Sequence, residues 1–172
     1  MSNKLKKILL HPGDFAFVES GEHIHTLLGS CISITLWHPQ RHIGGMCHFM
    51  LPERPSRQAK GAELDGRYAD EVMMLFQREA VRNRTRLSEY QAKIFGGGNM
   101  VVGSGDITNS IGAKNAATAM QLLMGEGIDI LVAHVGEFGH RRIYFDVGTG
   151  EVWVRHHALK GLGRLNSLSG KN

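Results

Sequence analysis

Residues 25–52 read HTLLGSCISITLWHPQRHIGGMCHFMLP, and this stretch predicts the hairpin around which the rest of the chain is built. Apolar and polar residues alternate over 31–37, which is typical of a strand with one apolar face. A second strand is expected over 43–51. The connection between them contains Pro39, which cannot donate a hydrogen bond inside a central sheet. We therefore expect two antiparallel strands joined by a short loop.

The loop also predicts the register of this hairpin. If Trp37 pairs with His42, then Cys31 lies opposite His48. Directly opposite residues have Cβ atoms about 4.5–5.5 Å apart, so this thiol and this imidazole would meet. The same register turns Cys47 to the other face of the sheet, where a core position is expected. A slip of one residue would break the arrangement.

Cys31 is the candidate nucleophile. It follows Gly29 and Ser30, a flexible turn that can expose the start of the strand and aim backbone N–H groups at one point. An imidazole within reach of the thiol generates the thiolate and later protonates the leaving group. The alternative interpretation is a buried cysteine beside a satisfied histidine, since free cysteine is commonly a small core residue. The residues alone leave both interpretations open.

Apolar spacing outside the hairpin predicts two helices and five more strands. The helices are expected over 68–83, with Asp65 as a possible cap, and over 110–126, between a cap at Ser110 and an end at Gly127. Residues 21–25 are expected to form a loop that leads into the hairpin. The polar segment 53–65 is interpreted as a mobile loop near the site or a disordered connection. The further strands are expected over 15–18, 91–95, 128–135, 142–147 and 151–155.

These elements favour a single α/β domain of the α+β type. Helix and strand alternate too irregularly for a doubly wound parallel sheet. The 172 residues suffice for one domain with a sizeable core, and the 42% of hydrophobic residues argue against disorder. We expect a layered sandwich in which about two helices pack on mixed, largely antiparallel sheets. The domain is expected to span 1–157, followed by a loose tail over 158–172.

Composition and motif spacing exclude several classes of function. No apolar run is long enough to span a membrane, and the first ten residues lack the features of a signal peptide, so a cytoplasmic protein is expected. The net charge of +4 favours acidic partners, but an aromatic content of 7% and the lack of a recognisable motif argue against nucleic acid. Two cysteines in dissimilar environments predict no disulfide, and no Cys-x-x-Cys pair supports a metal site.

A glycine-rich segment, Gly96-Gly97-Gly98-Asn99, follows the strand expected over 91–95. It lacks the Gly-Lys-Ser or Gly-Lys-Thr of a phosphate loop, so nucleotide binding is weakly supported and no cofactor is expected. A loop that lets the backbone of a substrate approach the thiol fits better. Gly97 and Asn99 are therefore candidate substrate-binding residues.

Several motifs together resemble the chemoreceptor glutamine deamidase family, CheD. LLGSC at 27–31 and HFMLP at 48–52 place Cys31 and His48 seventeen positions apart. KIFGGGNM at 93–100, IGAKNAA at 111–117 and GHRRIYFDVGTGEVWV at 139–154 extend the likeness, with His140 inserted where the family usually runs from glycine straight to arginine. The likeness covers residues 13–154, and the paired cysteine and histidine motifs at this separation are its most specific part.

The resemblance implies a mechanism and a substrate. Cys31 would be the nucleophile and His48 the general base and acid, while backbone N–H groups near Gly29, Ser30 and Cys31 would hold the oxyanion. The family uses a threonine shortly before the cysteine to orient the histidine. Thr26 is the candidate, with His25 or a backbone carbonyl as alternatives. The reaction would convert glutamine side chains of the cytoplasmic helices of chemoreceptors to glutamate, through a thioester and with release of ammonia.

Partners and rival functions complete the expectations. The resemblance implies a CheC-type phosphatase as a second partner in organisms that have one, and the positive net charge would steer the enzyme to acidic receptor helices. A non-catalytic binding module of the chemotaxis array would keep the fold without a reactive thiol, so a depressed thiol pKa would favour the enzyme. A cysteine peptidase or a transglutaminase would use the same pair of residues, and product masses would separate these outcomes.

Overall fold

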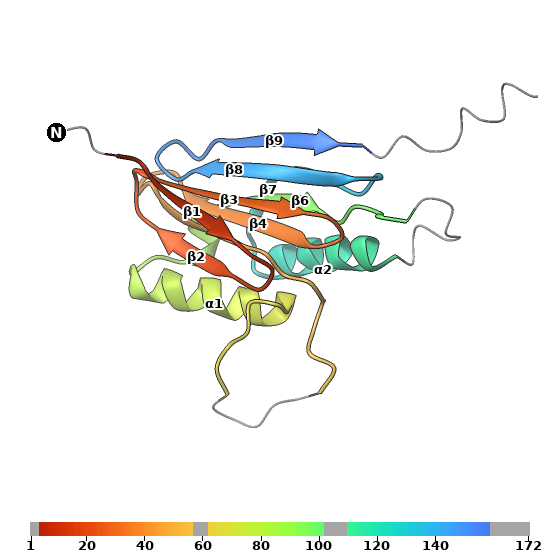
Figure 1. The fold of residues 1–172 in the computed structure, drawn as a ribbon. Coiled ribbons are helices and arrows are strands. Elements are labelled where there is room, and N and C mark those ends of the chain that lie inside the picture. The colour runs from red at the N-terminus through yellow and green to blue at the C-terminus, as the bar shows by residue number, and fades with distance from the viewer. Residues whose placement is uncertain (1–3, 57–61, 102–109, 159–172) are drawn as a thin grey trace, which may run out of the picture.

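Two sheets and two helices form a layered sandwich (Figure 1). The structure is a computed structural model, and it describes residues 4–56, 62–101 and 110–158. From one side to the other, the layers are a four-stranded sheet, a five-stranded sheet and the helices. The α+β sandwich with mixed, largely antiparallel sheets that the sequence predicts is therefore confirmed.

The four-stranded sheet, called the outer sheet below, has one face that no other layer of the described chain covers. Its strand order is β1-β3-β8-β9, in which β1 and β3 are parallel and the other neighbours are antiparallel. Along β3 and β8, alternate residues are buried against the second sheet. The strands are β1 (Lys6–Leu10), β3 (Glu22–Leu28), β8 (His140–Asp146) and β9 (Val152–His157).

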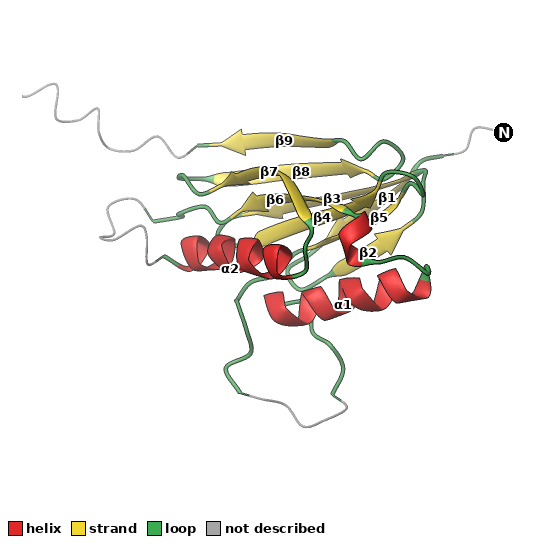
Figure 2. Cartoon of the chain, turned by 180° about the vertical axis from the view of Figure 1, so that it is seen from behind, coloured by secondary structure: helices red, strands yellow, loops and turns green. Residues whose placement is uncertain are grey.

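The five-stranded sheet, called the central sheet below, is covered on both faces except at its edge strand β7 (Asp129–Val135), which is largely exposed. Its order is β2-β5-β4-β6-β7, with only β6 and β7 parallel. Helices α1 (Ala69–Arg82) and α2 (Ile111–Gly125) both lie on the side away from the outer sheet (Figure 2). The strands are β2 (Phe15–Val18), β5 (Ile43–Cys47), β4 (Ile32–His38), β6 (Gln91–Gly96) and β7 (Asp129–Val135).

Alternate residues of β4 belong to two separate cores. Ile32, Ile34 and Leu36 pack toward the helices, together with Cys47 and Phe49. Residues of the opposite parity face the outer sheet, where the second core contains Leu10, Ile24, Leu28, Met46, Phe95, Ile143, Phe145 and Val147. The alternation in β4 thus predicts the face correctly. It does not reveal that the more polar face is also buried, because the covering strands lie elsewhere in the chain.

The hairpin is present, but its expected register is wrong. Trp37 pairs with Gly44 and His38 with Ile43, so the pairing is displaced by two residues from the Trp37–His42 pair. His38 remains in the strand because its side chain is buried and packs edge-to-face on Tyr90. The turn then closes at His42, whose φ is 53°. A shift of two residues preserves the face of every side chain, because side chains alternate with a period of two.

Two expectations around the hairpin are also corrected. Residues 22–25 are not a loop, because they belong to β3, where His23 and His25 point outward while Ile24 is buried between the sheets; only Gly21 lies in the turn before the strand. The second hairpin strand ends at Cys47 rather than at residue 51. Beyond it, Phe49 and Leu51 form only isolated bridges, to Ile32 and Tyr68.

The helices begin and end close to the expected residues. Ser110 caps α2 by accepting a 3.1 Å hydrogen bond from the backbone N–H of Ala113, as predicted, and Gly127 follows the helix with a φ of 68°. Helix α1 instead begins after Tyr68, without a side-chain cap, so the cap expected at Asp65 is wrong. Neither helix combines the length and the apolar character needed to cross a membrane, within the described ranges.

Two expected segments fall largely or partly outside the described residues. Of the loop at 53–65, residues 57–61 are not described, and of the tail at 158–172 only Ala158 is.

Candidate active site

The candidate site lies where β3 ends, β4 begins and the chain leaves β5. Ile32 and Phe49 exchange two backbone hydrogen bonds of 3.1 and 2.9 Å. Cys31 and His48 precede these two residues, so they are diagonal neighbours across the pair rather than directly opposite. Diagonal neighbours on one face lie about 7–8 Å apart, within reach of long side chains. Both side chains face the outer sheet, because Cys31 packs on the core between the sheets and His48 contacts β3.

The His48 imidazole is held in one orientation by Thr26. His48 is buried, and its Nδ1 lies 2.7 Å from Thr26 Oγ1. The same hydroxyl donates to the backbone carbonyl of Leu10 at 2.8 Å. A hydroxyl has one proton, so Thr26 Oγ1 must accept from Nδ1–H of the imidazole. The neutral ring therefore has its free lone pair on Nε2, as a general base requires.

His25 does not take part in this contact. It alternates with Thr26 along β3, so its ring lies on the uncovered face of the outer sheet and stacks on Tyr144 with a centroid distance of 5.6 Å. Of the three alternatives for orienting His48, the structure thus brings Thr26 to the imidazole. The carbonyl of Leu10 accepts the hydrogen bond from the Thr26 hydroxyl. The sequence did not predict this contact, because no strand was expected over the residues of β1.

The backbone of His48 is held from its other side by the loop before β2. Gly13 N–H donates to the His48 carbonyl at 2.8 Å, and His48 N–H donates to the Asp14 carbonyl at 3.2 Å. The regular ladder is interrupted just before this point, where Ile34 N–H donates to the Cys47 sulfur at 3.2 Å.

The two cysteines lie in different environments, as the alternation predicts. Cys47 is fully buried among the residues that face the helices, and burial raises the pKa of its thiol to about 12. Cys31 is half-buried, at the edge of the other core. Cys47 is therefore a protonated core residue at neutral pH, which leaves Cys31 as the accessible thiol of the described chain.

Burial acts on both members of the candidate pair. It lowers the pKa of His48 to about 4, against an opposing effect of Asp14, and it raises the pKa of the Cys31 thiol. Both groups are thus neutral near pH 7 in the free protein. A depressed thiol pKa, which would favour an enzyme over a binding module, is therefore absent from the free protein. A proton would have to pass from the thiol to His48 during the attack, rather than before it.

Protonation of His48 should also make stability depend on pH. A histidine in the unfolded chain takes up a proton near pH 6.5, whereas burial lowers the pKa of His48 in the folded protein to about 4. The unfolded state therefore binds more protons in this interval, and we expect the free energy of unfolding to fall by about 3 kcal/mol in total as the pH drops through it. Urea unfolding of the wild type and of His48→Gln at several pH values would measure this. Equal pH dependence of the two proteins would contradict the assignment.

The turn before Cys31 is held from outside by the glycine-rich segment. Gly98 N–H donates to the Gly29 carbonyl at 2.9 Å, and Gly97 N–H donates to the Cys31 carbonyl at 2.8 Å. Gly97 has a φ of 62°, and a Cβ on Gly96 would lie 2.2 Å from the Cys31 carbonyl oxygen. The glycines thus permit close approach to the Cys31 turn. Their close contact is with the protein's own backbone rather than with the backbone of a substrate.

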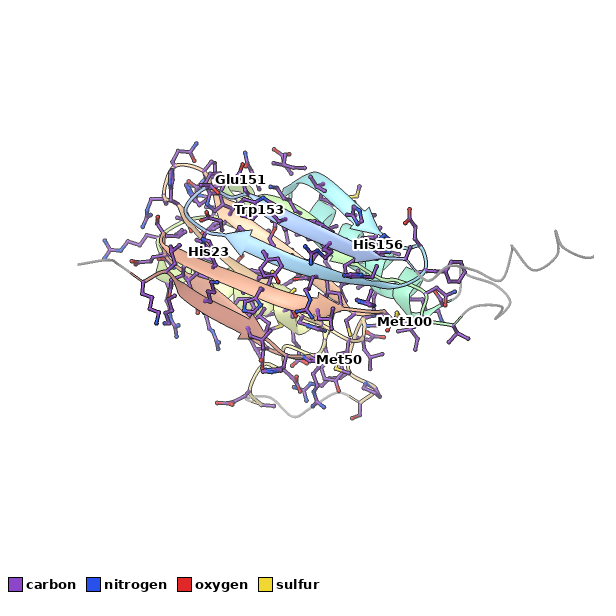
Figure 3. All side chains as sticks on the ribbon, turned by 45° about the horizontal axis from the view of Figure 1, so that its top comes forward. His23, Met50, Met100, Glu151, Trp153 and His156 are labelled. Carbon is purple, nitrogen blue, oxygen red and sulfur yellow. The ribbon has the colours of Figure 1, made fainter. Side chains whose placement is uncertain are left out.

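The backbone N–H groups of Ser30 and Cys31 point to no acceptor within the described part of the chain. Both N–H groups are therefore available as hydrogen-bond donors to a ligand. Two exposed methionines, Met50 and Met100, lie at this end of the sandwich (Figure 3). Met100 is beside Gly29, because its sulfur lies 3.2 Å from where a Cβ on that glycine would be.

Asn99 lies next to this turn, at the wall of a cavity of about 230 Å³. Ser30, Gly98 and Met100 also line the cavity, as do residues 110–112 at the start of α2. The Asn99 side-chain oxygen accepts a 3.0 Å hydrogen bond from Val101 N–H. Asn99 therefore shapes the wall beside Ser30, and its amide nitrogen remains the group through which it could contact a ligand.

A buried arginine supports the glycine-rich segment. Arg141 is fully buried and donates to the carbonyls of Gly96 and Gly136 at 3.2 and 2.7 Å, and to His134 Nδ1 at 2.8 Å. His134 thus accepts a hydrogen bond.

No group of three or more potential metal ligands gathers within residues 4–56, 62–101 and 110–158.

The comparison with known proteins decides the family. The family model described as CheD chemotactic sensory transduction matches residues 50–156, which is more than half of the chain. The chain belongs to the CheD family. The likeness seen in the sequence motifs is thereby confirmed.

Relatives of this CheD-family chain match it over most of its length. It is 48% identical over 152 residues to the probable chemoreceptor glutamine deamidase CheD 3 of Dechloromonas aromatica, covering 88% of each chain. It is 42% identical over 156 residues to the probable chemoreceptor glutamine deamidase CheD of Pseudomonas syringae pv. tomato, covering 90% of this chain and 91% of the relative. Such long matches necessarily span Thr26, Cys31 and His48.

Among solved structures, the hypothetical protein YfiH of Bacillus licheniformis matches 70% of this chain and 49% of its own, with 18% identity and a TM-score of 0.39. This likeness is too weak to support an argument about the CheD-family site.

Proposed function

We propose that this protein is a glutamine deamidase that hydrolyses side-chain amides of chemoreceptors. One observation carries the proposal: Thr26 holds the His48 imidazole with Nε2 unprotonated, on the same face as the accessible thiol of Cys31. The family adds the substrate, because the relatives are named chemoreceptor glutamine deamidases. A thiol and an imidazole can hydrolyse an amide without a cofactor.

The first half of the reaction forms a thioester. The Cys31 sulfur attacks the carboxamide carbon while His48 Nε2 takes the thiol proton, and the carbonyl electron pair moves onto the oxygen. The N–H groups of Ser30 and Cys31 stabilise this oxyanion. When the intermediate collapses, the C–N bond breaks, and His48 gives its proton to the departing nitrogen. Ammonia leaves, and the acyl group remains on Cys31.

The second half uses water. A water molecule attacks the thioester carbon and gives a proton to His48 Nε2. The C–S bond then breaks, and the proton returns to the sulfur. The sum is glutamine plus water to glutamate plus ammonia. The neutral resting pair suits both halves, since His48 must begin each of them without a proton on Nε2.

The charge of the protein suits an acidic partner. The net charge of +4 would accelerate encounter with acidic receptor helices, and this attraction weakens as salt is added. Conversion of glutamine to glutamate adds negative charge to such a helix and so can bias its signalling state. A CheC-type phosphatase partner and a cytoplasmic location stay predictions from the sequence.

Mass spectrometry of a receptor cytoplasmic fragment tests the proposal. After incubation with the protein, we expect the mass change of a carboxamide to a carboxylate at particular glutamines, and one ammonia released for each. Cleavage of the main chain would indicate a peptidase, and incorporation of an added amine would indicate a transglutaminase. An unchanged fragment with several receptors and a folded protein would favour a binding module.

Replacement of Thr26 tests the orientation of His48. Thr26→Val keeps the shape but removes the acceptor of Nδ1–H, so the imidazole is free to change tautomer. We expect kcat to fall on the order of ten- to a hundredfold, as for other groups that orient a functional histidine. Thr26→Ser keeps the hydroxyl and should retain most of the activity. Steady-state kinetics of both variants decide the matter, and equal activity of Thr26→Val and the wild type would contradict the role.

A further inference from the structure

Asn115 joins the two segments that contain the candidate catalytic residues. It lies on the buried face of α2 and is fully buried. Its amide nitrogen donates to the Ser30 carbonyl at 3.2 Å and to the Met50 carbonyl at 2.8 Å. Ser30 directly precedes Cys31, and Met50 follows His48 by two positions. A single side chain therefore ties the start of β4 to the segment after β5.

The amide oxygen of Asn115 has no hydrogen-bond partner in the described part of the chain. The orientation of the amide is nevertheless determined, because carbonyl oxygens only accept and the NH₂ group must face both of them. Burial of an unpaired oxygen is unfavourable, so packing alone would favour an apolar residue of this size. The reason for an asparagine at position 115 is therefore its NH₂ group, which supplies both hydrogen-bond donors.

The bond to Ser30 also determines a direction. A trans peptide unit is planar, so its C=O and N–H groups point in opposite directions. The Ser30 carbonyl and the Cys31 N–H belong to one such unit. Because Asn115 holds the carbonyl toward α2, the Cys31 N–H points away from α2. Gly98 acts in the same way on the preceding unit, since it holds the Gly29 carbonyl and so directs the Ser30 N–H.

We propose that Asn115 is a positioning residue that orients the Cys31 N–H toward the oxyanion. This inference rests on the proposed function. Asn115 touches neither thiol nor imidazole in the described contacts and acts through the peptide unit of Ser30 and Cys31. It should therefore matter for reactions that develop an oxyanion and not for reactions of the thiol that lack one.

Two variants and one matched control separate these reactions. Asn115→Leu removes the donors together with the unpaired oxygen, and Asn115→Asp replaces the NH₂ group by an oxygen at nearly unchanged size. The control is Thr118→Ala on the same helix, which removes a side-chain bond to the Lys114 carbonyl. Thermal unfolding of each variant establishes that it is folded, so that one folded Asn115 variant suffices for the comparison.

Three measurements are made on each folded protein. The first is kcat and KM for deamidation of a receptor fragment. The second is the dissociation constant of a peptide in which an aldehyde replaces the glutamine carboxamide. The Cys31 thiol adds to this aldehyde, with its proton passing to the carbonyl oxygen, and forms a reversible hemithioacetal. The third is the rate of alkylation by iodoacetamide against pH, a displacement of iodide at carbon that develops no oxyanion.

We expect kcat to fall by about ten- to a hundredfold with little change in KM, because a misdirected donor loses part of the 10²–10³-fold that one oxyanion donor contributes. Aldehyde affinity should fall by a similar factor, while the alkylation rate and its pH profile stay those of the wild type. A matching loss of alkylation would show that Asn115 acts on the thiol itself and overturn the inference. Unchanged kcat and aldehyde affinity would also overturn it.

The results that would contradict the proposed function differ from those that would contradict the role of Asn115. A wild-type protein that deamidates no receptor fragment ends both proposals, whereas an active wild type with an equally active Asn115→Leu ends only this one. If neither variant folds, a crystal structure of the wild-type aldehyde adduct decides. The hemithioacetal oxygen should lie within hydrogen-bond distance of the Cys31 N–H, and an oxygen turned away from that group would contradict the inference.

Discussion

Replacement of Cys31 by alanine is expected to abolish deamidation, with a fall in kcat of at least about 10⁴-fold. The thiol forms the covalent bond of the proposed mechanism, and no other accessible thiol exists in the described chain to replace it. The variant should fold, because Cys31 is half-buried and alanine leaves only a small space at the edge of the core. Ammonia release and the mass of a receptor fragment measure the loss.

The second cysteine provides the matched control for this variant. Cys47→Ala removes a fully buried sulfur from the core that faces the helices. We expect it to be less stable by about 1–2 kcal/mol, because a small cavity replaces the sulfur and the Ile34 N–H loses its acceptor, and to keep its activity. The opposite pattern, with Cys31→Ala active and Cys47→Ala inactive, would contradict both the assignment of the nucleophile and the proposed mechanism.

Replacement of His48 by glutamine is expected to lower kcat on the order of 10²–10⁴-fold, as for loss of a general acid and base. Glutamine can still occupy the space beside Thr26, but it cannot take the proton of the Cys31 thiol or transfer it to the departing amide nitrogen. Because Cys31 and His48 act as a unit, the double variant should be no less active than Cys31→Ala alone. Single-turnover assays with a receptor fragment measure both comparisons.

His25→Gln is the control for this replacement, since His25 lies one position from Thr26 on the uncovered face of the outer sheet. Its kcat should equal that of the wild type. A large loss in His25→Gln, together with an active His48→Gln, would show that the other histidine near the turn is the functional one.

Local patterns in the sequence predict the features that depend on interactions between neighbouring residues in the chain. The alternation over 31–37 predicts both the strand and the opposite faces of Cys31 and Cys47, because side chains of a strand alternate. The spacing of apolar residues predicts both helices, and Ser110 caps α2 as expected from its hydroxyl. The motifs that contain Cys31 and His48 identify the family, which the comparisons confirm.

Pairing between distant segments is less visible in a sequence. The strand β3 is not expected from the sequence, because His23 and His25 interrupt its apolar pattern. They face outward because Ile24 between them is buried against the central sheet, and the strand itself forms by pairing with β1 and β8. The register of the hairpin was wrong by two residues, because burial of His38 against Tyr90 extends the strand. Tyr90 lies far along the chain from this turn, so no local rule includes its effect.

The sequence by itself therefore determined the class of fold, the family, the two faces of the hairpin and the candidate nucleophile. Only the tertiary structure decided how the site is assembled. It brings Thr26 from β3 and the Leu10 carbonyl from β1 to His48, and Asn115 from α2 to Ser30. The physical reason is that alternation, helical spacing and capping involve neighbours in the chain, whereas these hydrogen bonds depend on which strands and helices pack together.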